Sequence, residues 1–459
     1  MDTKKLRQKI LDLAIRGKLV PQDPNDEPAS VLLERIKAEK ERLIKEGKIK
    51  RSKKSASDTS HYENWPFEIP ENWTWCRVDD FAYVVSGSTP SKDAFVEKGI
   101  PYIKMYNLRN QQIDFFFHPQ YIKPEVHNGK LQRSRTEVGD LIMNIVGPPL
   151  GKLAIIPSDL PESNFNQAAV LIRPYMYKEI LVNYLFYYLS EMSEINSIST
   201  KGSAGQVNIS LTQSQNMRIA LPPLNEQVRI VKEVRKWFTY VDSIDSNACE
   251  LEELIDNTKQ SILRMAIQGK LVKQNPSDEP AIDLLKRINP NIQIPCDNPH
   301  YQKLPNGWAM TSMQNICQLR DGEKRSDIPR TNLDVKYLRG KSEGEMVSSG
   351  KYVPSGSTMI LVDGENSGEI FTSVIEGFQG STFKLLDVSS EMNMGFVLLV
   401  IKSHQQEFRE NKVGSAIPHL NKKLFKEIAV MIPPIEEQQR IVESTQQYLN
   451  LLEFISDKL

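Results

Sequence analysis

The acidic residues best placed for catalysis are Asp363 and Glu365, in the segment Asp-Gly-Glu-Asn-Ser-Gly. Paired carboxylates can act as general acid and base when both reach one reacting group. A matching glycine turn occurs earlier in the chain, at residues 144–151, and that turn contains no acidic residue. We therefore expect both turns to be polar recognition turns, and a catalytic pair is the weaker interpretation.

Other sequence signatures of catalysis are absent. The chain has neither a G-x-x-x-x-G-K-[ST] phosphate-binding loop nor a G-x-G-x-x-G dinucleotide motif. Its three Pro-Pro pairs lack the neighbouring residues of an adenine methyltransferase tetrad. The six histidines are scattered without the spacing of metal ligands, so we expect no metal site. An enzyme that acts alone is disfavoured, and methyl transfer by the isolated chain would revive that alternative.

A larger group of polar residues has the chemistry to contact nucleic acid. Arg and Lys match the acceptors of guanine, Asn and Gln match adenine, and glycine lets the backbone approach closely. In the first half of the chain the candidates are Lys104, Asn107, Arg109, Asn144, Lys152, Lys201, Gln206 and Asn208. In the second half they are Lys324, Arg325, Arg330, Arg339, Lys341, Asn366, Lys412 and His419. Taken singly, each can equally be an ordinary solvated or turn residue.

The best supported pair in this group is Lys104 and Arg339. Tyr102-Ile103-Lys104 in the first half is answered by Tyr337-Leu338-Arg339 in the second. Both pairs of flanking residues lie at the same offset from a repeated Trp, so we expect the two cations to occupy equivalent places.

An internal repeat positions these residues. Residues 10–29 (ILDLAIRGKLVPQDPNDEPA) recur as residues 262–281 (ILRMAIQGKLVKQNPSDEPA). Residues 70–73 are answered by residues 305–308, and LPPLNEQ at 221–227 is answered by IPPIEEQ at 432–438. Such self-similarity outweighs local patterns in choosing a fold. The chain is therefore expected to contain two copies of one framework that differ in the parts that contact a ligand.

The segment from Pro222 to Val272 predicts a long coiled-coil helix that joins the copies. Its apolar residues alternate at steps of four and three: Ile230, Val234, Trp237, Val241, Ile244, Ala248, Leu251, Ile255, Ile262 and Met265. About 44 residues at a rise of about 1.5 Å give a rod of about 65 Å. By the repeats, residues 2–17 and 434–459 correspond to the two ends of this helix. We expect the two chain ends to build a composite helix antiparallel to it, which closes a pseudo-twofold ring.

The expected fold class is α+β, with two similar globular domains joined by this antiparallel coiled coil. The predicted parts are an N-terminal helix and basic linker (1–60), a first globular domain (61–222), a central helix and linker (223–290), a second globular domain (291–433) and a C-terminal helix (434–459). The linker from Glu34 to Lys54 ends in a basic cluster. It is interpreted as a solvated helix with a flexible tail, or as an arm that contacts phosphates or a partner.

Composition and charge further limit the kinds of protein that this chain can be. The chain has 459 residues and a formal net charge of zero, whereas a protein that grips nucleic acid alone is more often basic. Local basic patches, or partners that supply phosphate contacts, are therefore expected. The four cysteines are far apart and fit a reducing cytosol. The charged N-terminus is unlike a signal peptide and no apolar run reaches membrane-spanning length, so the expected location is cytoplasmic, without a membrane partner.

The repeat pattern resembles a known family. Two variable regions, the Gly-Lys-Leu-Val segments and the P-P-[LI]-x-E-Q-x-x-I-V helix starts are similar to the specificity subunit of type I restriction–modification systems. The resemblance covers essentially the whole chain. It implies that each globular domain is a target recognition domain that reads one half of a bipartite, asymmetric site in double-stranded DNA, while the coiled coil sets the spacing.

The same resemblance implies partners and cofactors. Two methyltransferase subunits would dock on the coiled coil and carry S-adenosylmethionine, and restriction subunits would supply ATP- and Mg-dependent cleavage; this chain itself would be non-catalytic. Candidate partner-binding residues open the two Pro-Pro helices: Glu226, Gln227, Glu437 and Gln438. Their alternative role is the ordinary preference for acidic residues at a helix N-terminus. A coiled-coil adaptor with two protein-binding domains is the competing class, which footprinting on DNA would separate from DNA recognition.

Overall fold

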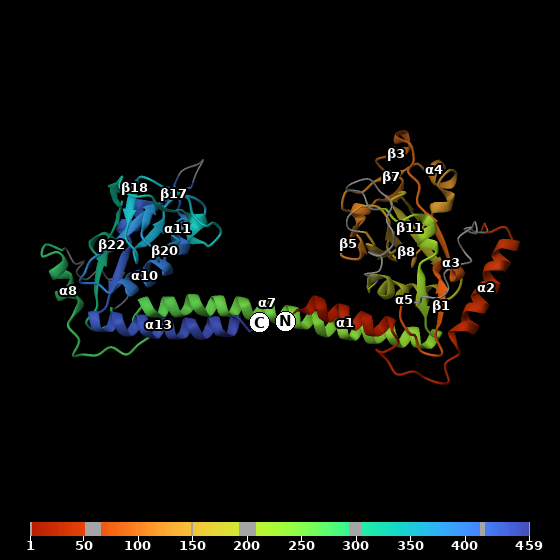
Figure 1. Ribbon diagram of the computed structural model, residues 1–459, viewed down its shortest axis with the longest axis horizontal. Helices are drawn as coiled ribbons and strands as arrows, with labels where there is room; N and C mark the ends of the chain where they lie inside the picture. The colour runs from red at the N-terminus through yellow and green to blue at the C-terminus, as the bar shows by residue number, and fades with distance from the viewer. Residues whose placement is uncertain are drawn as a thin grey trace. The chain divides into compact units, whose positions relative to one another are not determined.

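The computed structural model describes residues 2–50, 66–147, 150–191, 208–292, 304–413 and 418–458 (Figure 1). The chain divides into two compact units, Met1–Ser246 and Asn247–Leu459. Each unit consists of one α+β domain and helices that pack against it. The central helix α7, Leu224–Ile267, contributes its first half to one unit and its second half to the other.

The first unit contains domain 1, built on two four-stranded sheets. One sheet has the order β2-β11-β8-β9 and the other has the order β10-β4-β7-β3. The strands of the first are β2 (Ala82–Ser86), β11 (Ala169–Pro174), β8 (Leu141–Asn144) and β9 (Leu153–Ile155); those of the second are β10 (Asn164–Phe165), β4 (Ile100–Ile103), β7 (Tyr121–Ile122) and β3 (Phe95–Val96). Two short ladders complete it: β1 (Thr74–Arg77) with β12 (Arg218–Leu221), and β5 (Leu108–Arg109) with β6 (Gln112–Ile113). The helices before α7 are α1 (Thr3–Ile15), α2 (Ala29–Lys45), α3 (Val78–Phe81), α4 (Pro124–Asn128), α5 (Lys178–Glu191) and α6 (Leu211–Gln215).

The second unit contains domain 2, which has the same plan. Its sheets have the orders β14-β22-β19-β20 and β15-β18-β21-β16-β17, with β13 and β23 as the short ladder. The strands are β13 (Ala309–Ser312), β14 (Cys317–Arg320), β15 (Glu323–Arg325), β16 (Arg330–Leu333), β17 (Met346–Val347), β18 (Gly350–Val353), β19 (Thr358–Leu361), β20 (Ile370–Thr372), β21 (Gly377–Gln379), β22 (Phe383–Val388) and β23 (Ala429–Ile432). The helices are α8 (Ala281–Ile288), α9 (Val335–Leu338), α10 (Met394–Ser403), α11 (Gln405–Glu410), α12 (Lys422–Glu427) and α13 (Ile435–Ser456).

The two domains agree in strand pairing as well as in strand order. In domain 1, β4 is parallel to β10 and antiparallel to β7; in domain 2, β16 is parallel to β21 and antiparallel to β17. The other sheet is antiparallel throughout in both. The predicted α+β class with two similar domains is therefore confirmed. Domain 2 adds two strands, β15 and β18, at one sheet edge, and at the other edge its described residues form no strand that corresponds to β3.

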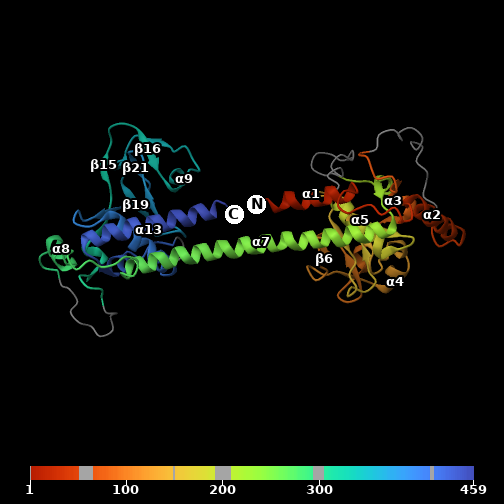
Figure 2. The same ribbon diagram turned by 90° about the horizontal axis from the view of Figure 1, so that it is seen from below.

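The amphipathic face of α7 packs against a different terminal helix in each unit (Figure 2). In the first unit, Ile10 and Ala14 of α1 share one apolar core with Ile230 and Val234 of α7. Arg7, near the start of α1, reaches Asp242 of α7 at 2.5 Å, and Gln22, beyond the end of α1, reaches Glu226 at the start of α7 at 2.7 Å, so the two helices run antiparallel. Burial of these apolar faces, each fully covered side chain contributing about 2 kcal/mol, offsets the marginal stability of an isolated helix.

The second unit repeats this arrangement with α13. Ile441 of α13 lies in one core with Leu263 and Ala266 of α7. Two residues predicted for the apolar seam of α7 are exposed instead, Met265 in this unit and Trp237 in the first unit. Leu263 and Ala266 are the buried residues near Met265. The predicted closure of the chain into a pseudo-twofold ring depends on how the two units are arranged. It therefore stays a prediction.

The linker after α2 is described only in part. Helix α2 ends at Lys45, and Lys48 and Lys50 are exposed, while residues 51–54 of the basic cluster lie outside the described ranges. Among the described residues, no helix is long and apolar enough to cross a membrane.

Candidate DNA interface

The two predicted glycine turns occupy equivalent places in the two domains. Strand β8 leads to Gly147 and Gly151, and strand β19 leads to Gly364 and Gly368, all four with positive φ (95°, 72°, 103° and 93°). The amide of Gly151 donates to the carbonyl oxygen of Asn144 (3.2 Å), and Gly368 donates to Leu361 in the same way (2.7 Å). The match predicted from the sequence is confirmed, and glycine is needed because the left-handed region disfavours side chains.

A second chain segment runs beside each turn. The amide of Ile209 donates to the carbonyl of Ile145 (2.9 Å), and Leu420 donates to Val362 (2.7 Å). These bonds place Asn208 and His419, the residues just before, against the equivalent positions Val146 and Asp363. Each glycine turn is therefore accompanied by a polar residue that differs between the domains.

In domain 2 the carboxylate of Asp363 is engaged by this partner. His419 Nδ1 lies 2.7 Å from Asp363 Oδ1. Lys412 Nζ donates to the carbonyl oxygen of Glu365 at 2.8 Å, and Asn366 is exposed at the tip of the turn. Asp363 thus orients a histidine at a polar turn, as the recognition interpretation expects.

The glycine turn of domain 1 borders a hollow of about 630 Å³. Its lining residues come from the β5–β6 hairpin and from the turn: Tyr106, Leu108, Arg109, Asn110, Gln111, Phe117, Leu150, Gly151, Lys152 and Leu153. The Arg109 guanidinium lies 3.9 Å from the centroid of the Phe117 ring, and the side chain of Lys152 is exposed. Two cations and two aromatic rings therefore share one open surface, a combination suited to phosphates and bases.

Two of the predicted contact residues are structural instead. Asn107 is 1% exposed; its Oδ1 accepts from the amide of Lys104 (2.9 Å) and its Nδ2 donates to the carbonyl of Phe117 (2.8 Å). Asn144 is buried, and its side chain bonds the backbone at Lys152 and Val146. Their predicted role in base contact is wrong, because their polar atoms are consumed in shaping the loops.

The predicted equivalence of Lys104 and Arg339 is also wrong. Ile103 ends strand β4 and its carbonyl accepts from Asn166, whereas Leu333 ends the equivalent strand β16 and accepts from Gly380. The residue that follows is Lys104 in domain 1 and Asp334 in domain 2. Tyr337 and Leu338 lie in α9, not in a strand. The two similar tripeptides therefore sit on different elements.

Lys104 itself remains partly exposed beside aromatic rings. Its Nζ lies 5.6 Å from the ring centroid of Phe95 and 6.0 Å from that of Tyr106. Lys324 and Lys341 in domain 2 are exposed. Lys201 and Gln206 lie outside the described residues.

The predicted arginines of domain 2 carry acidic partners. Arg339 pairs with Glu369, which occupies the position after the glycine turn that Lys152 occupies in domain 1. Arg325 lies 3.9 Å from the centroid of Tyr352 and pairs with Glu323 (2.8 Å).

Arg330 is the most enclosed of the three arginines. It is 8% exposed, and it is held by Asp327 (2.5 Å) and Glu376 (3.3 Å). Arg330 is therefore a structural residue, which corrects its assignment as a contact.

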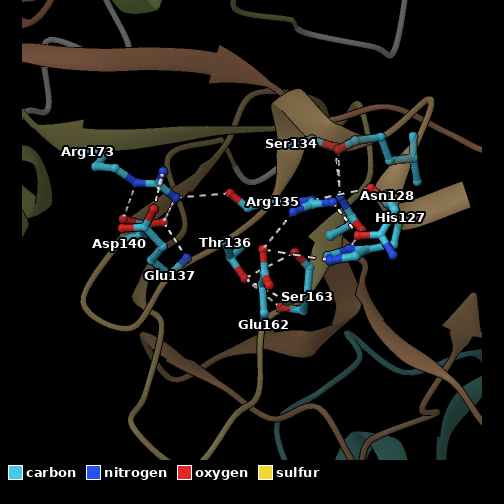
Figure 3. A network of polar contacts seen from close by, with 12 residues as sticks. His127, Asn128, Ser134, Arg135, Thr136, Glu137, Asp140, Glu162, Ser163 and Arg173 are labelled. Atoms are coloured by element: carbon cyan, nitrogen blue, oxygen red, sulfur yellow. Dashed lines mark hydrogen bonds and ion pairs between the residues drawn. The ribbon is translucent and has the colours of Figure 1, made fainter. Parts of the chain in front are cut away.

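A buried polar network supports domain 1, and sequence patterns missed it (Figure 3). Asp140 is fully buried and pairs with Arg173 (2.5 Å) and Lys178 (2.7 Å). His127 Nδ1 lies 2.6 Å from Oδ1 of Asn164; that oxygen can only accept, so His127 donates. Asp140 directly precedes β8, and Asn164 lies in β10 of the other sheet, so the network supports both sheets of domain 1. They are isolated polar residues in the sequence, so no spacing signal marks them.

The four predicted partner-binding residues are buried, which corrects the expectation that they form an exposed surface. Glu226 is 1% exposed; its carboxylate accepts from Trp73 Nε1 (3.0 Å) and from Gln22 Nε2 (2.7 Å). The Nε2 group of Gln227 donates to the carbonyl of Pro222 (2.9 Å). Burial raises the pKa of the Glu226 carboxyl above its ordinary value.

The same cluster recurs in the second unit. Glu437 accepts from Trp308 (3.1 Å) and Gln274 (3.2 Å), and burial likewise raises its pKa. Gln438 Nε2 donates to Pro433 (3.0 Å), and its Oε1 accepts from the amide of Asn393 (2.9 Å). The two Pro-Pro segments therefore resemble each other because each forms the same buried junction. That junction joins the globular domain, the residues around the Gly-Lys-Leu-Val segment and the helix.

Comparison with known proteins agrees with this architecture. The family model described as "Type I restriction modification DNA specificity domain" matches residues 70–253 and 305–459. The chain is 30% identical to the type I restriction enzyme EcoAI specificity subunit of Escherichia coli over 79% of this chain and 70% of that one. It is 33% identical to the EcoEI specificity subunit of the same organism over 62% of this chain, and it spans about half (54%) of that relative's length.

A solved structure shares the fold. The HsdS subunit from Thermoanaerobacter tengcongensis superposes with a TM-score of 0.52 at 17% identity, covering 85% of this chain and 93% of that one. A structure from a type I R-M system gives a TM-score of 0.55 at 16% identity over 86% and 94%. Since the specificity domain model matches both globular domains and most of the sequence, this chain belongs to the type I restriction modification DNA specificity domain family.

Proposed function

We propose that this chain is the DNA-recognition subunit of a type I restriction–modification complex, and that each domain reads one half of a bipartite, asymmetric site. One observation carries the proposal. The two domains present the same glycine turn on the same strand, but the side chains around it differ. A shared backbone with different polar groups suits two half-sites of different sequence.

The differing groups have the chemistry of base and phosphate contact. Around the turn, domain 1 offers Lys152 and Arg109, and domain 2 offers His419 and Lys412 with Asn366 at the tip. Arg and Lys bind guanine acceptors and phosphates, and amides suit adenine. Lys324 and Lys341, which are exposed, and Lys104, which is partly exposed, complete the candidate set, with Arg325 and Arg339 held beside acidic partners.

The chain is proposed to act without catalysing a reaction itself. Methylation of an adenine requires the base to leave the stack, so a recognition subunit must hold the duplex for a neighbouring enzyme. Two methyltransferase subunits carrying S-adenosylmethionine are the proposed partners, and restriction subunits using ATP and Mg are proposed to join them in the cytoplasm. The net charge of zero supports this proposal, because a neutral subunit depends on partners for part of its phosphate contacts.

The central helix is proposed to fix the distance between the half-sites. An α-helix rises about 1.5 Å per residue, so α7 has a defined length, unlike a flexible linker. The expected target is then two short specific sequences separated by a constant number of unspecified base pairs.

The test is to express the full chain with its methyltransferase subunit in a host without adenine methylation and to map methylated adenines by long-read sequencing. The proposal expects one motif of two parts with a fixed gap. A control expressing the methyltransferase subunit alone should give no such motif. Methylation without a sequence motif, or the same motif without this chain, would refute the proposal.

A further inference from the structure

We infer that Phe116 of domain 1 is a wedge that inserts between adjacent base pairs of the half-site which domain 1 reads. The inference rests on the proposed function and adds a residue that pattern analysis overlooked, although three consecutive phenylalanines, Phe115 to Phe117, stand out in the sequence.

Phe116 is exposed on a backbone that is held firmly. Its side chain is 82% exposed, whereas Phe115 beside it is 5% exposed and lies 5.4 Å from Tyr121, centroid to centroid. The buried Asn107 amide donates to the carbonyls of Asp114 (3.0 Å) and Phe117 (2.8 Å). Leaving a Phe side chain in water forgoes about 2 kcal/mol of burial. A ring that is exposed on an anchored turn is therefore poised for a partner.

Cationic groups lie beside the residue that follows Phe116. The neighbouring residue Phe117 carries the Arg109 guanidinium 3.9 Å from its ring centroid, and Lys152 lines the same hollow. At the tip of the β5–β6 hairpin, Asn110 and Gln111 both have positive φ (47° and 59°), which is the backbone of a type I′ hairpin turn. The residue that follows Phe116 thus belongs to a surface that offers cations and amides.

This combination favours DNA as the occupant. Proteins that kink a duplex insert Phe, Leu or Met between base steps, and nearby Arg and Lys bind the groove and the phosphates. A hydrophobic protein partner would not need the cations. In domain 2, helix α9 follows the strand equivalent to β4, so the wedge is proposed for one half-site alone.

The experiment uses the full-length chain in complex with its methyltransferase subunit and a duplex of the mapped target, with 2-aminopurine placed at each position of the half-site in turn. Three variants are compared: Phe116→Ala, Phe116→Leu, and Val138→Ala as a matched exposed apolar control (53% exposed). Because both positions are exposed, the variants should assemble and fold normally, which circular dichroism and gel filtration verify.

Extrusion of the adenine that is methylated also raises fluorescence at its own position. The wedge predicts a further rise in 2-aminopurine fluorescence at one other step with the unsubstituted complex, since unstacking relieves quenching. Phe116→Ala should lose that signal and bind about tenfold more weakly, and a duplex already unstacked by an abasic site at that step should restore its affinity. Phe116→Leu should keep most of both properties, and Val138→Ala should match the unsubstituted complex.

Three results would overturn the inference. Target-specific binding by Phe116→Ala with unchanged affinity and fluorescence would exclude the wedge while leaving the proposed function intact. Failure of Phe116→Ala to assemble with the methyltransferase subunit would assign the ring to a protein interface. If the unsubstituted complex does not prefer its target, the proposed function fails and the wedge fails with it.

Discussion

The indole N–H of Trp73 donates to a buried carboxylate oxygen of Glu226, 3.0 Å away. Trp73 begins the globular domain and Glu226 lies in the first turn of α7, so this bond fixes the domain on the helix. Gln22 completes the junction from the Gly-Lys-Leu-Val segment. Because Trp308, Glu437 and Gln274 repeat it in the second unit, each domain is seated on its helix by the same contacts.

This junction predicts a pH dependence of stability. Burial raises the pKa of Glu226 above its value in the unfolded chain, so the folded state holds the proton more tightly. The resulting stabilisation is fully present below the unfolded pKa, about 4.3, and is lost as the pH rises through the folded pKa. Glu226→Gln removes this titration, so its cost in free energy of unfolding should be larger near pH 4 than near pH 7.

Urea unfolding followed by tryptophan fluorescence at several pH values measures this difference. Glu427→Gln, at an exposed position in α12, is the control and should cost little free energy of unfolding. An equal cost of Glu226→Gln at pH 4 and pH 7 would contradict the assignment of a raised pKa.

Gly17 follows the end of α1 and Gly269 follows the end of α7, and neither position should tolerate a side chain. Gly17 has a φ of 65°, and a Cβ there would lie 2.4 Å from the Pro70 ring; Gly269 has a φ of 68° and would meet Pro305 at 2.6 Å. Gly47 has a similar φ of 72° but open space around it. Gly47→Ala therefore measures the cost of a side chain at positive φ without a steric contact. We expect Gly17→Ala to lower the free energy of unfolding by about 2–4 kcal/mol and Gly47→Ala by about 1 kcal/mol. Equal costs in urea titrations would show that the contact with Pro70 adds nothing.

The ion pair between Arg339 and Glu369 allows a test of the second domain. If Arg339 contacts DNA, Arg339→Ala should weaken target binding about tenfold, because a good base contact contributes about 1–3 kcal/mol. Glu369→Ala removes the competing carboxylate and should preserve or strengthen binding. Fluorescence anisotropy titrations of the complex with its methyltransferase subunit measure both. Equal weakening by the two variants would assign the pair to structure instead.

Lys152 is expected to contact a phosphate, since its side chain is exposed beside the hollow of domain 1. Lys152→Ala should lower affinity similarly for all sequences and reduce the slope of log K against log salt by about 1. Lys5→Ala, on α1, removes another exposed charge and should leave the slope unchanged. A slope unchanged by Lys152→Ala would remove this residue from the interface.

Much of the framework was predictable because its sequence is repeated within the chain. Repeated segments predicted the two domains, the central helix and the matching glycine turns, since segments of matching sequence adopt matching backbone geometry. Side-chain roles were less predictable. Asn107 and Glu226 have types common at interfaces, yet tertiary contacts bury them. Tyr337-Leu338-Arg339 resembled Tyr102-Ile103-Lys104 because short local patterns do not distinguish a strand end from a helical turn.

The central claim is that each domain independently reads its own half of the target. The most direct measurement replaces the first globular domain, residues 73–221, with the equivalent segment of another family member and maps the methylated adenines again. The account predicts that one half of the motif changes while the other half and the gap stay the same. A motif that changes in both halves, or in neither, would contradict it.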